Sequence, residues 1–190
     1  MARIVFATFG SLGDLHPMIA LGLELQQRGH DIVFSVMDFY REKVETLGFE
    51  FLPMRPQMDI NDRDLVVKLM DPAKGPENML KHTIFPVLHD TYDDLMRNLE
   101  GADLFVTGEV VYAAKSVAEK SGVKWVTTSL SPISMFSNYD PGVFPMAEWL
   151  ENLRFMPVFF HQGMFAVLRW MLQMTGLFEQ YKTFRRNLGL

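Results

Sequence analysis

The chain has 190 residues, of which 48% are hydrophobic and 22% charged, so its composition is that of a globular domain rather than a disordered segment. It has 18 Lys and Arg against 23 Asp and Glu, and the net charge of −5 argues against a chain whose main task is binding nucleic acid. Cysteine is absent, which excludes disulfides, thiolate metal sites and a cysteine nucleophile. The counts of 14 Met and 16 Phe are unusually high, and this surplus of apolar side chains calls for a structural or functional explanation.

Short apolar runs alternate with helical patterns along the first 130 residues. We predict strands at 3–9, 31–36, 49–52, 104–107 and 124–129 and helices at 15–28, 39–47, 77–99 and 110–120. The third helix should kink at Pro86, and residues 54–77 predict a long polar loop. An apolar helix is expected within 155–178.

This alternation predicts an α/β fold, a Rossmann-like doubly wound parallel sheet with helices on both faces. Ligands of such sheets bind at the carboxyl ends of the strands, near the point at which the strand order reverses. The loops of interest are therefore those that follow Phe9, Val36, Thr107 and Ser129.

No segment predicts insertion into a membrane. The apolar residues before Gly10 are too few for the core of a signal peptide, and the apolar stretch 156–178 is interrupted by His161, Gln162 and Arg169. We expect a soluble, cytoplasmic protein.

The turn after the first strand reads Phe9-Gly10-Ser11-Leu12-Gly13-Asp14-Leu15-His16-Pro17. Its glycines permit positive φ and close approach of a ligand. One interpretation is an NAD(P) site with Asp38 as the ribose-binding acid, but the turn has G-x-x-G rather than G-x-G-x-x-G. Asp14 would also repel a pyrophosphate at the helix N-terminus, so this interpretation is the less favoured one.

Asp14 itself has two interpretations, which are compatible with each other. It can cap the helix, where its charge suits the positive end of the helix dipole. It can also act as a general base that takes a proton from a bound hydroxyl. The residues alone leave both open, and His16 is equally consistent with a first-turn residue that has no task.

The same residues resemble the start of the N-terminal domain of the glycosyltransferase-B (GT-B) fold, in the UDP-glycosyltransferase, sterol and antibiotic glucosyltransferase-like family. The family pattern runs G-S-x-G-D-x-x-P, then A-L, then R-G-H, and the chain is similar to it at 10–17, 20–21 and 28–30. Further similar segments lie at 48–53, 102–108, 113–118 and 184–190. The resemblance is weakest at 54–100 and 131–175.

The resemblance implies transfer of a hexose, with inversion, from a nucleotide-diphosphate sugar to a hydroxyl of a hydrophobic acceptor such as a lipid, sterol or natural-product aglycone. It implies that Asp14 is the acceptor-activating base, where many relatives carry His. Relatives often orient that His with an Asp after the fourth strand, whereas this chain reads Thr107-Gly108-Glu109 there. The acceptor contacts that we expect come from Ser11, Leu12, Gly13, His16, Thr107, Glu109, Ser131, Phe136, Phe160 and Met164.

In the family the donor, here expected to be a UDP-sugar, binds a C-terminal domain that typically carries a His-Gly-Gly motif, and no such motif occurs in this sequence. We therefore expect residues 1–190 to be a truncated N-terminal acceptor-binding domain that is inactive alone and works with a donor-binding domain in cis or in trans. It should bind no cofactor or metal itself, since its histidines are scattered. The alternative is a non-catalytic hydrophobic-ligand or partner-binding subunit of a split glycosyltransferase.

The apolar stretch 155–178 has three interpretations. It can pack in the core or against the partner domain, it can form a plastic acceptor pocket, or it can make a peripheral membrane contact. Basic residues nearby give the last one modest support, namely Arg169, Lys182, Arg185 and Arg186.

Overall fold

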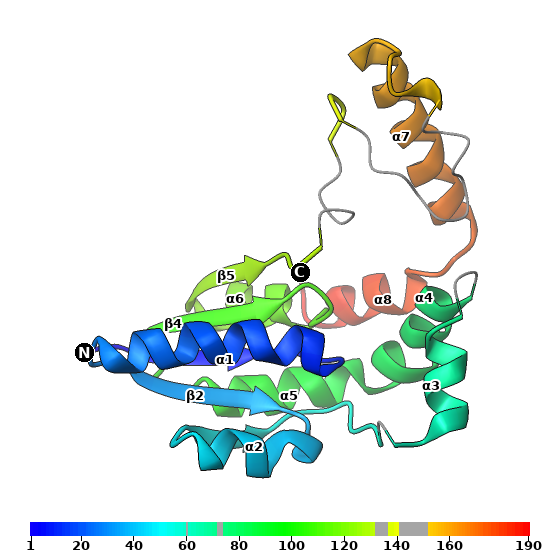
Figure 1. Cartoon of the computed structure of the whole chain (residues 1–190). Helices are drawn as coiled ribbons and strands as arrows, with labels where there is room; N and C mark the ends of the chain where they lie inside the picture. Colours follow the sequence, from blue (N-terminus) through cyan, green and yellow to red (C-terminus); the bar gives the residue numbers. More distant parts are fainter. Residues whose placement is uncertain (60, 72–73, 132–136, 141–151) are drawn as a thin grey trace.

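The computed structural model describes residues 1–59, 61–71, 74–131, 137–140 and 152–190. Its centre is a five-stranded sheet with the order β3-β2-β1-β4-β5, in which every neighbouring pair is parallel (Figure 1). The strands are β1 (Arg3–Ala7), β2 (Asp31–Val36), β3 (Glu50–Pro53), β4 (Leu104–Gly108) and β5 (Lys124–Thr128). The predicted Rossmann-like parallel sheet is confirmed.

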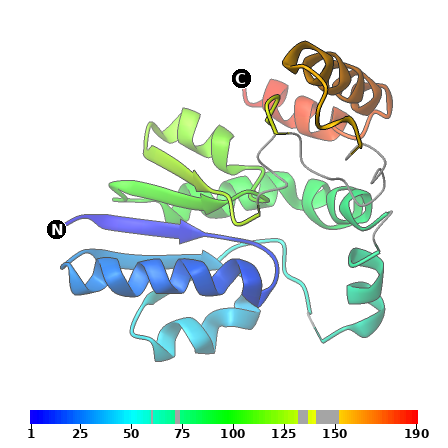
Figure 2. The same cartoon turned by 45° about the horizontal axis from the view of Figure 1, so that its top comes forward.

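Helices cover both faces of this sheet. On one face lie α1 (Leu12–Gln27) and α2 (Arg41–Thr46), and on the other lie α5 (Leu88–Asn98), α6 (Ala114–Ser121) and α8 (Glu179–Asn187) (Figures 1 and 2). The approach of α1 to the sheet depends on Gly22, because a Cβ there would lie 3.1 Å from the ring of Phe34. Helix α1 begins three residues earlier than predicted, since the turn before it supplies its own cap.

The prediction of an open loop at 54–77 is wrong. Helix α3 (Arg63–Leu69) forms there because Oδ1 of Asp62 accepts the N–H groups of Asp64 and Leu65, at 3.0 and 3.1 Å. Helix α4 (Gly75–Asn78) follows. Helix α3 is started by a local cap and has no buried residues, and α4 has no side-chain cap and buries only Gly75, so the hydrophobic pattern does not reveal either helix.

The long helix predicted at 77–99 is divided. A π-helical turn, η2 (Met79–Ile84), and a 3₁₀ turn, η3 (Phe85–Val87), precede α5. The break coincides with Pro86, which has no N–H to continue the helical ladder, and the predicted interruption is confirmed.

Much of the phenylalanine surplus lies in the core. The rings of Phe6 and Phe34 stack with their centroids 5.2 Å apart, and the ring centroid of Phe49 lies 4.9 Å from that of Phe34. Among the described residues, eight phenylalanines are buried, namely Phe6, Phe9, Phe34, Phe49, Phe51, Phe85, Phe105 and Phe184. Burial of these large aromatic rings stabilises the packing of the helices against the sheet.

Helix α7 (Val158–Met174) projects away from the sheet (Figures 1 and 2). It lies within the predicted 155–178, and Gly176, with φ of +66°, turns the chain into α8. Within the described residues of α7 only His161 is buried, whereas Phe159, Trp170 and Met174 are 74%, 61% and 70% exposed. Packing in this chain's own core is therefore the wrong interpretation for α7. Among the described helices, none is long and apolar enough to cross a bilayer.

Candidate functional site

The strand order reverses between β1 and β4, and parallel sheets bind ligands outside the carboxyl ends of the two strands at this point. We call this position the crevice. The chain leaves β1 through Gly10 and enters α1 at Leu12. It leaves β4 at Gly108, directly before Glu109. The first-turn residues and the 107–109 segment are thus brought to neighbouring strand ends, as the sequence predicts.

Ser11 and Asp14 form a capping box at the start of α1. The N–H of Ser11 donates to Oδ2 of Asp14 at 2.8 Å, and Oγ of Ser11 accepts the N–H of Gly13 at 3.1 Å. The hydroxyl of Ser11 also donates to Oδ2 of Asp14 at 3.2 Å. The predicted cap is confirmed, and it fixes the half-buried carboxylate at the edge of the crevice. The role of Asp14 as a base stays a prediction.

Gly10 makes this arrangement possible. Its φ is +130°, and a Cβ at this position would lie 2.4 Å from Oδ2 of Asp14. Any other residue would therefore both strain the backbone and displace the carboxylate. The glycine is required by the position of Asp14.

Tyr40 reaches the same turn from the neighbouring strand, and sequence reasoning missed it. It belongs to η1 (Asp38–Tyr40), the 3₁₀ turn that follows β2, and its hydroxyl donates to the carbonyl of Gly10 at 2.9 Å. Burial, together with the negative charge of Asp14, raises the pKa of Tyr40 above its ordinary value. Its place at the carboxyl end of β2 is the only sequence signal that could have drawn attention to it.

The other predicted acceptor residues differ in how accessible they are. Leu12, Gly13 and His16 are exposed on the first turn of α1, Glu109 is exposed after β4, and Ser131 is exposed after β5. Thr107 is fully buried, and its hydroxyl accepts a hydrogen bond from Nε1 of Trp125 at 3.0 Å. The side chain of Thr107 therefore lies behind the surface of the crevice and supports its neighbour in β5.

The predicted contacts on α7 do not lie at the crevice. Phe160 and Met164 are half-buried on α7, which stands apart from the strand ends (Figure 1). Phe136 lies outside the described residues. A depression of about 370 Å³ on α7 is lined by Asn138, Phe165, Leu168, Arg169 and Leu172. The structure thus places the predicted contacts of the first turn and those of α7 on two separate surfaces.

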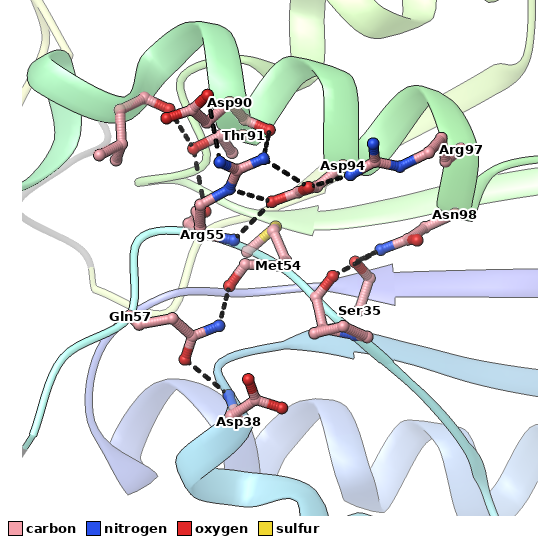
Figure 3. Close-up of polar contacts among 12 residues, drawn as sticks. Ser35, Asp38, Met54, Arg55, Gln57, Asp90, Thr91, Asp94, Arg97 and Asn98 are labelled. Carbon is pink, nitrogen blue, oxygen red and sulfur yellow. Dashed lines mark hydrogen bonds and ion pairs between the residues drawn. The ribbon is translucent and has the colours of Figure 1, made fainter.

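A second polar group, which we call the Arg55 cluster (Arg55, Asp90, Thr91, Asp94 and Arg97), joins the loop after β3 to α5 (Figure 3). Asp94 accepts hydrogen bonds from the N–H, Nε and Nη2 of Arg55 at 3.1, 2.8 and 2.9 Å, and Arg97 also contacts it. Arg55 pairs with Asp90 at 3.1 Å, and its carbonyl accepts from the hydroxyl of Thr91 at 2.9 Å. Burial opposes the charge of Asp94, but its bonds to Arg55 outweigh burial and lower the pKa of this carboxyl.

Asp38 does not behave as a ribose-binding acid. Its carboxylate pairs with Arg41 at 2.8 Å, and its N–H donates to Oε1 of Gln57 at 2.8 Å. The start of α1, where a pyrophosphate would bind, is taken by the carboxylate of Asp14. Both observations count against the dinucleotide interpretation. In the portion of the chain that the structure describes, no three metal-ligating side chains come together.

Known proteins resemble this chain in sequence, although no family model matches it. It is 30% identical over 141 residues to an uncharacterised glycosyltransferase of Mycobacterium bovis, in an alignment that covers 69% of this chain and 33% of the relative. It is 29% identical over 167 residues to 4'-demethylrebeccamycin synthase of Lentzea aerocolonigenes, which covers 80% of this chain and 39% of that enzyme. The chain is related to glycosyltransferases. It spans about a third of the length of these curated relatives.

Solved glycosyltransferases share the fold. The structure superposes on the calicheamicin glycosyltransferase with a TM-score of 0.55, at 19% identity, over 97% of this chain and 45% of that one. The glycosyltransferase VinC, solved in complex with dTDP, matches with a TM-score of 0.50 at 18% identity, over 66% of this chain and 34% of that one. These likenesses confirm the expected GT-B-type architecture.

Proposed function

We propose that residues 1–190 form the acceptor-binding part of an inverting glycosyltransferase, in which Asp14 is the general base. The observation that carries this proposal is the position of Asp14: its carboxylate is held by Ser11 at the carboxyl end of the central strand, in the crevice where the strand order reverses. The bonds that the structure gives to this carboxylate, within the described residues, end on Oδ2. Oδ1 is therefore the oxygen that we assign to proton transfer.

In the proposed reaction a hydroxyl oxygen of the acceptor attacks the anomeric carbon of the donor sugar. The new C–O bond forms as the bond from that carbon to the diphosphate breaks, so the leaving group departs as a nucleotide diphosphate and the configuration inverts. Asp14 takes the proton of the attacking hydroxyl, which prevents positive charge from building on that oxygen. Holding base and nucleophile in line supplies the orientation part of the rate enhancement.

The donor in this scheme binds a second, donor-binding domain that joins this one in cis or in trans. We propose that alone the 190-residue chain is inactive in transfer. A UDP-sugar is the donor expected from the sequence, and the dTDP bound to VinC makes a dTDP-sugar the second donor to test.

We place the hydrophobic acceptor between the crevice and α7. The exposed first-turn residues Leu12 and His16 border the crevice, and α7 presents apolar side chains such as Phe159 and Trp170 to solvent. Large exposed apolar surface of this kind marks a binding surface for a ligand or partner. The name of the Lentzea relative, a rebeccamycin-type synthase, supports a natural-product aglycone as the class of acceptor.

The test is Asp14→Asn, assayed with the donor-binding domain present and with both donors. We expect transfer to fall by about 10²–10⁴-fold, the usual contribution of a general base, with donor binding unchanged. The matched control is Asp93→Asn, which removes an exposed acid from α5 and should leave transfer intact. Transfer by Asp14→Asn at a rate near that of the unmodified protein would falsify the assignment of the base.

A further inference from the structure

Tyr40 and Asp14 contact opposite ends of a single peptide unit. The hydroxyl of Tyr40 donates to the carbonyl oxygen of Gly10 at 2.9 Å, and the N–H of Ser11, which belongs to the same peptide, donates to Oδ2 of Asp14 at 2.8 Å. A trans peptide is planar, and its carbonyl and N–H point in opposite directions. The direction of one of these hydrogen bonds therefore sets the direction of the other.

We propose that Tyr40 is a positioning residue for Asp14 and acts through the peptide that joins Gly10 and Ser11. This inference rests on the proposed function, in which Asp14 is the base. The phenol holds the carbonyl, the carbonyl sets the plane of the peptide, and the plane directs the N–H of Ser11 at the carboxylate. A carbonyl that accepts a hydrogen bond also makes the N–H of the same amide a stronger donor.

The peptide needs such a support because Gly10 is its first residue. With φ of +130° and no side chain, Gly10 gives the backbone conformational freedom at the point where the carboxylate must be fixed. The hydroxyl of Tyr40 removes that freedom from outside the turn. Since burial and the charge of Asp14 both raise the pKa of Tyr40, the phenol stays protonated near neutral pH and so remains a donor.

Tyr40 is itself held in place. Its side chain is only 4% exposed, and the turn that carries it begins with the N–H of Asp38 bonded to Oε1 of Gln57. Gln57 donates in turn to the carbonyl of Met54 at 3.0 Å, and the next residue along the chain enters the Arg55 cluster (Figure 3). Tyr40 therefore connects the candidate base to a loop that is fixed against α5.

The contact is tested first on the 190-residue chain, without any assay of transfer. Amide hydrogen exchange of Ser11 is measured by NMR in Tyr40→Phe, which removes the hydroxyl and keeps the ring. We expect exchange of this amide to accelerate by about tenfold, the equivalent of one hydrogen bond. The matched control is Tyr92→Phe, because Tyr92 is a half-buried tyrosine on α5 that packs against Phe184. An unchanged Ser11 amide in Tyr40→Phe, or equal acceleration in the control, overturns the proposal.

The catalytic consequence is tested with the donor-binding domain present. Tyr40→Phe should lower kcat by about tenfold and leave KM for the acceptor unchanged, since a misdirected base affects the chemical step rather than binding. Tyr92→Phe should change neither. If Asp14→Asn abolishes transfer while Tyr40→Phe keeps full kcat, the proposed function stands and the role of Tyr40 falls. If Asp14→Asn still transfers, the proposed function fails, and the positioning role fails with it even where Ser11 exchange has accelerated.

Discussion

Asp94→Asn removes the negative charge at the centre of the Arg55 cluster (Figure 3). Asp94 is 6% exposed and accepts three hydrogen bonds from Arg55, one of them from the backbone N–H. An amide of the same shape keeps one acceptor oxygen, but it turns an NH₂ group toward a guanidinium that can only donate. The substitution therefore breaks the join between the loop after β3 and α5 without creating a cavity.

The expected loss of stability in Asp94→Asn follows from how far each partner of the ion pair, Asp94 and Arg55, is buried. A hydrogen bond to a charged group contributes about 1.5–3 kcal/mol. The side chain of Arg55 is 38% exposed, so water compensates it for part of the loss. We expect the free energy of unfolding to fall by about 2 kcal/mol at neutral pH, which corresponds to a drop in Tm of about 4–8 °C for a domain of this size.

Urea and thermal unfolding, followed by circular dichroism, measure this effect. The control is Asp93→Asn, an exposed neighbour on the same helix, which should change the free energy of unfolding by less than about 0.5 kcal/mol. The gap between the unmodified protein and Asp94→Asn also depends on pH. Because Arg55 lowers the pKa of Asp94, the stabilisation is present above the ordinary Asp pKa and is lost as the pH falls through the lower, folded-state value.

Two results would refute this reasoning. One is a loss in Asp94→Asn no larger than that in Asp93→Asn, which would mean that the cluster does not hold the loop. The other is a gap in stability that stays constant as the pH is lowered from the ordinary Asp pKa through the lower, folded-state value, where protonation of Asp94 should close it.

Three further outcomes are expected. Gly10→Ala should lower the free energy of unfolding, measured by chemical denaturation, by about 2–3 kcal/mol, because it combines positive φ with a clash against Asp14. The control Gly29→Ala, at positive φ in open space, should cost about 1 kcal/mol, and equal losses in the two variants would disprove the clash. Thr8→Val should leave the free energy of unfolding unchanged or raise it by about 1 kcal/mol, because Oγ1 of Thr8 is buried and has no hydrogen-bond partner among the described residues. A clear drop in Tm would reveal a hydrogen bond that the structure does not show. Asp14→Asn should lower the pKa of Tyr40, which can be measured by ¹³C NMR of its Cζ. The pKa should stay above the ordinary tyrosine value because the phenol remains buried. An unchanged pKa would mean that Asp14 and Tyr40 are not coupled.

The central strands β1, β2 and β4 could be predicted from the sequence to within a few residues because they are buried on both faces and stand out as apolar runs such as 3–7 and 31–36. The edge strands β3 and β5 are more exposed. The helices that depend on local caps were harder to predict from the sequence. The cap formed by Asp62 starts α3 inside a segment that has no apolar stripe. Gly176 separates α7 from α8, although the hydrophobic pattern continues up to Phe178. Where a local hydrogen bond rather than burial decides the backbone, the pattern carries little information.

The candidate site divides in the same way. Ser11 and Asp14 could be predicted because their contact spans three residues within one turn. The contact of Tyr40 with Gly10 spans 30 residues and exists only because β1 and β2 pair side by side. The position of Thr107 could be predicted, but its burial depends on Trp125 in the adjacent strand. Side-chain direction at a strand end is set by the neighbouring strand, which one sequence does not reveal.

The central position of β1 also decides the order in which this sheet can assemble. β1 pairs with β2 after a short crossover, but its other edge is completed by β4, and the N–H of Arg3 finds its partner in Asp103, 100 residues along the chain. Contacts of such long range form slowly during folding. Until β4 arrives, a growing or refolding chain presents the edge of its most apolar strand to other copies, and an unpaired strand edge favours aggregation. Fragments that end before residue 104, and chains whose synthesis pauses there, should therefore aggregate. Fragments that include β4 should stay monomeric longer.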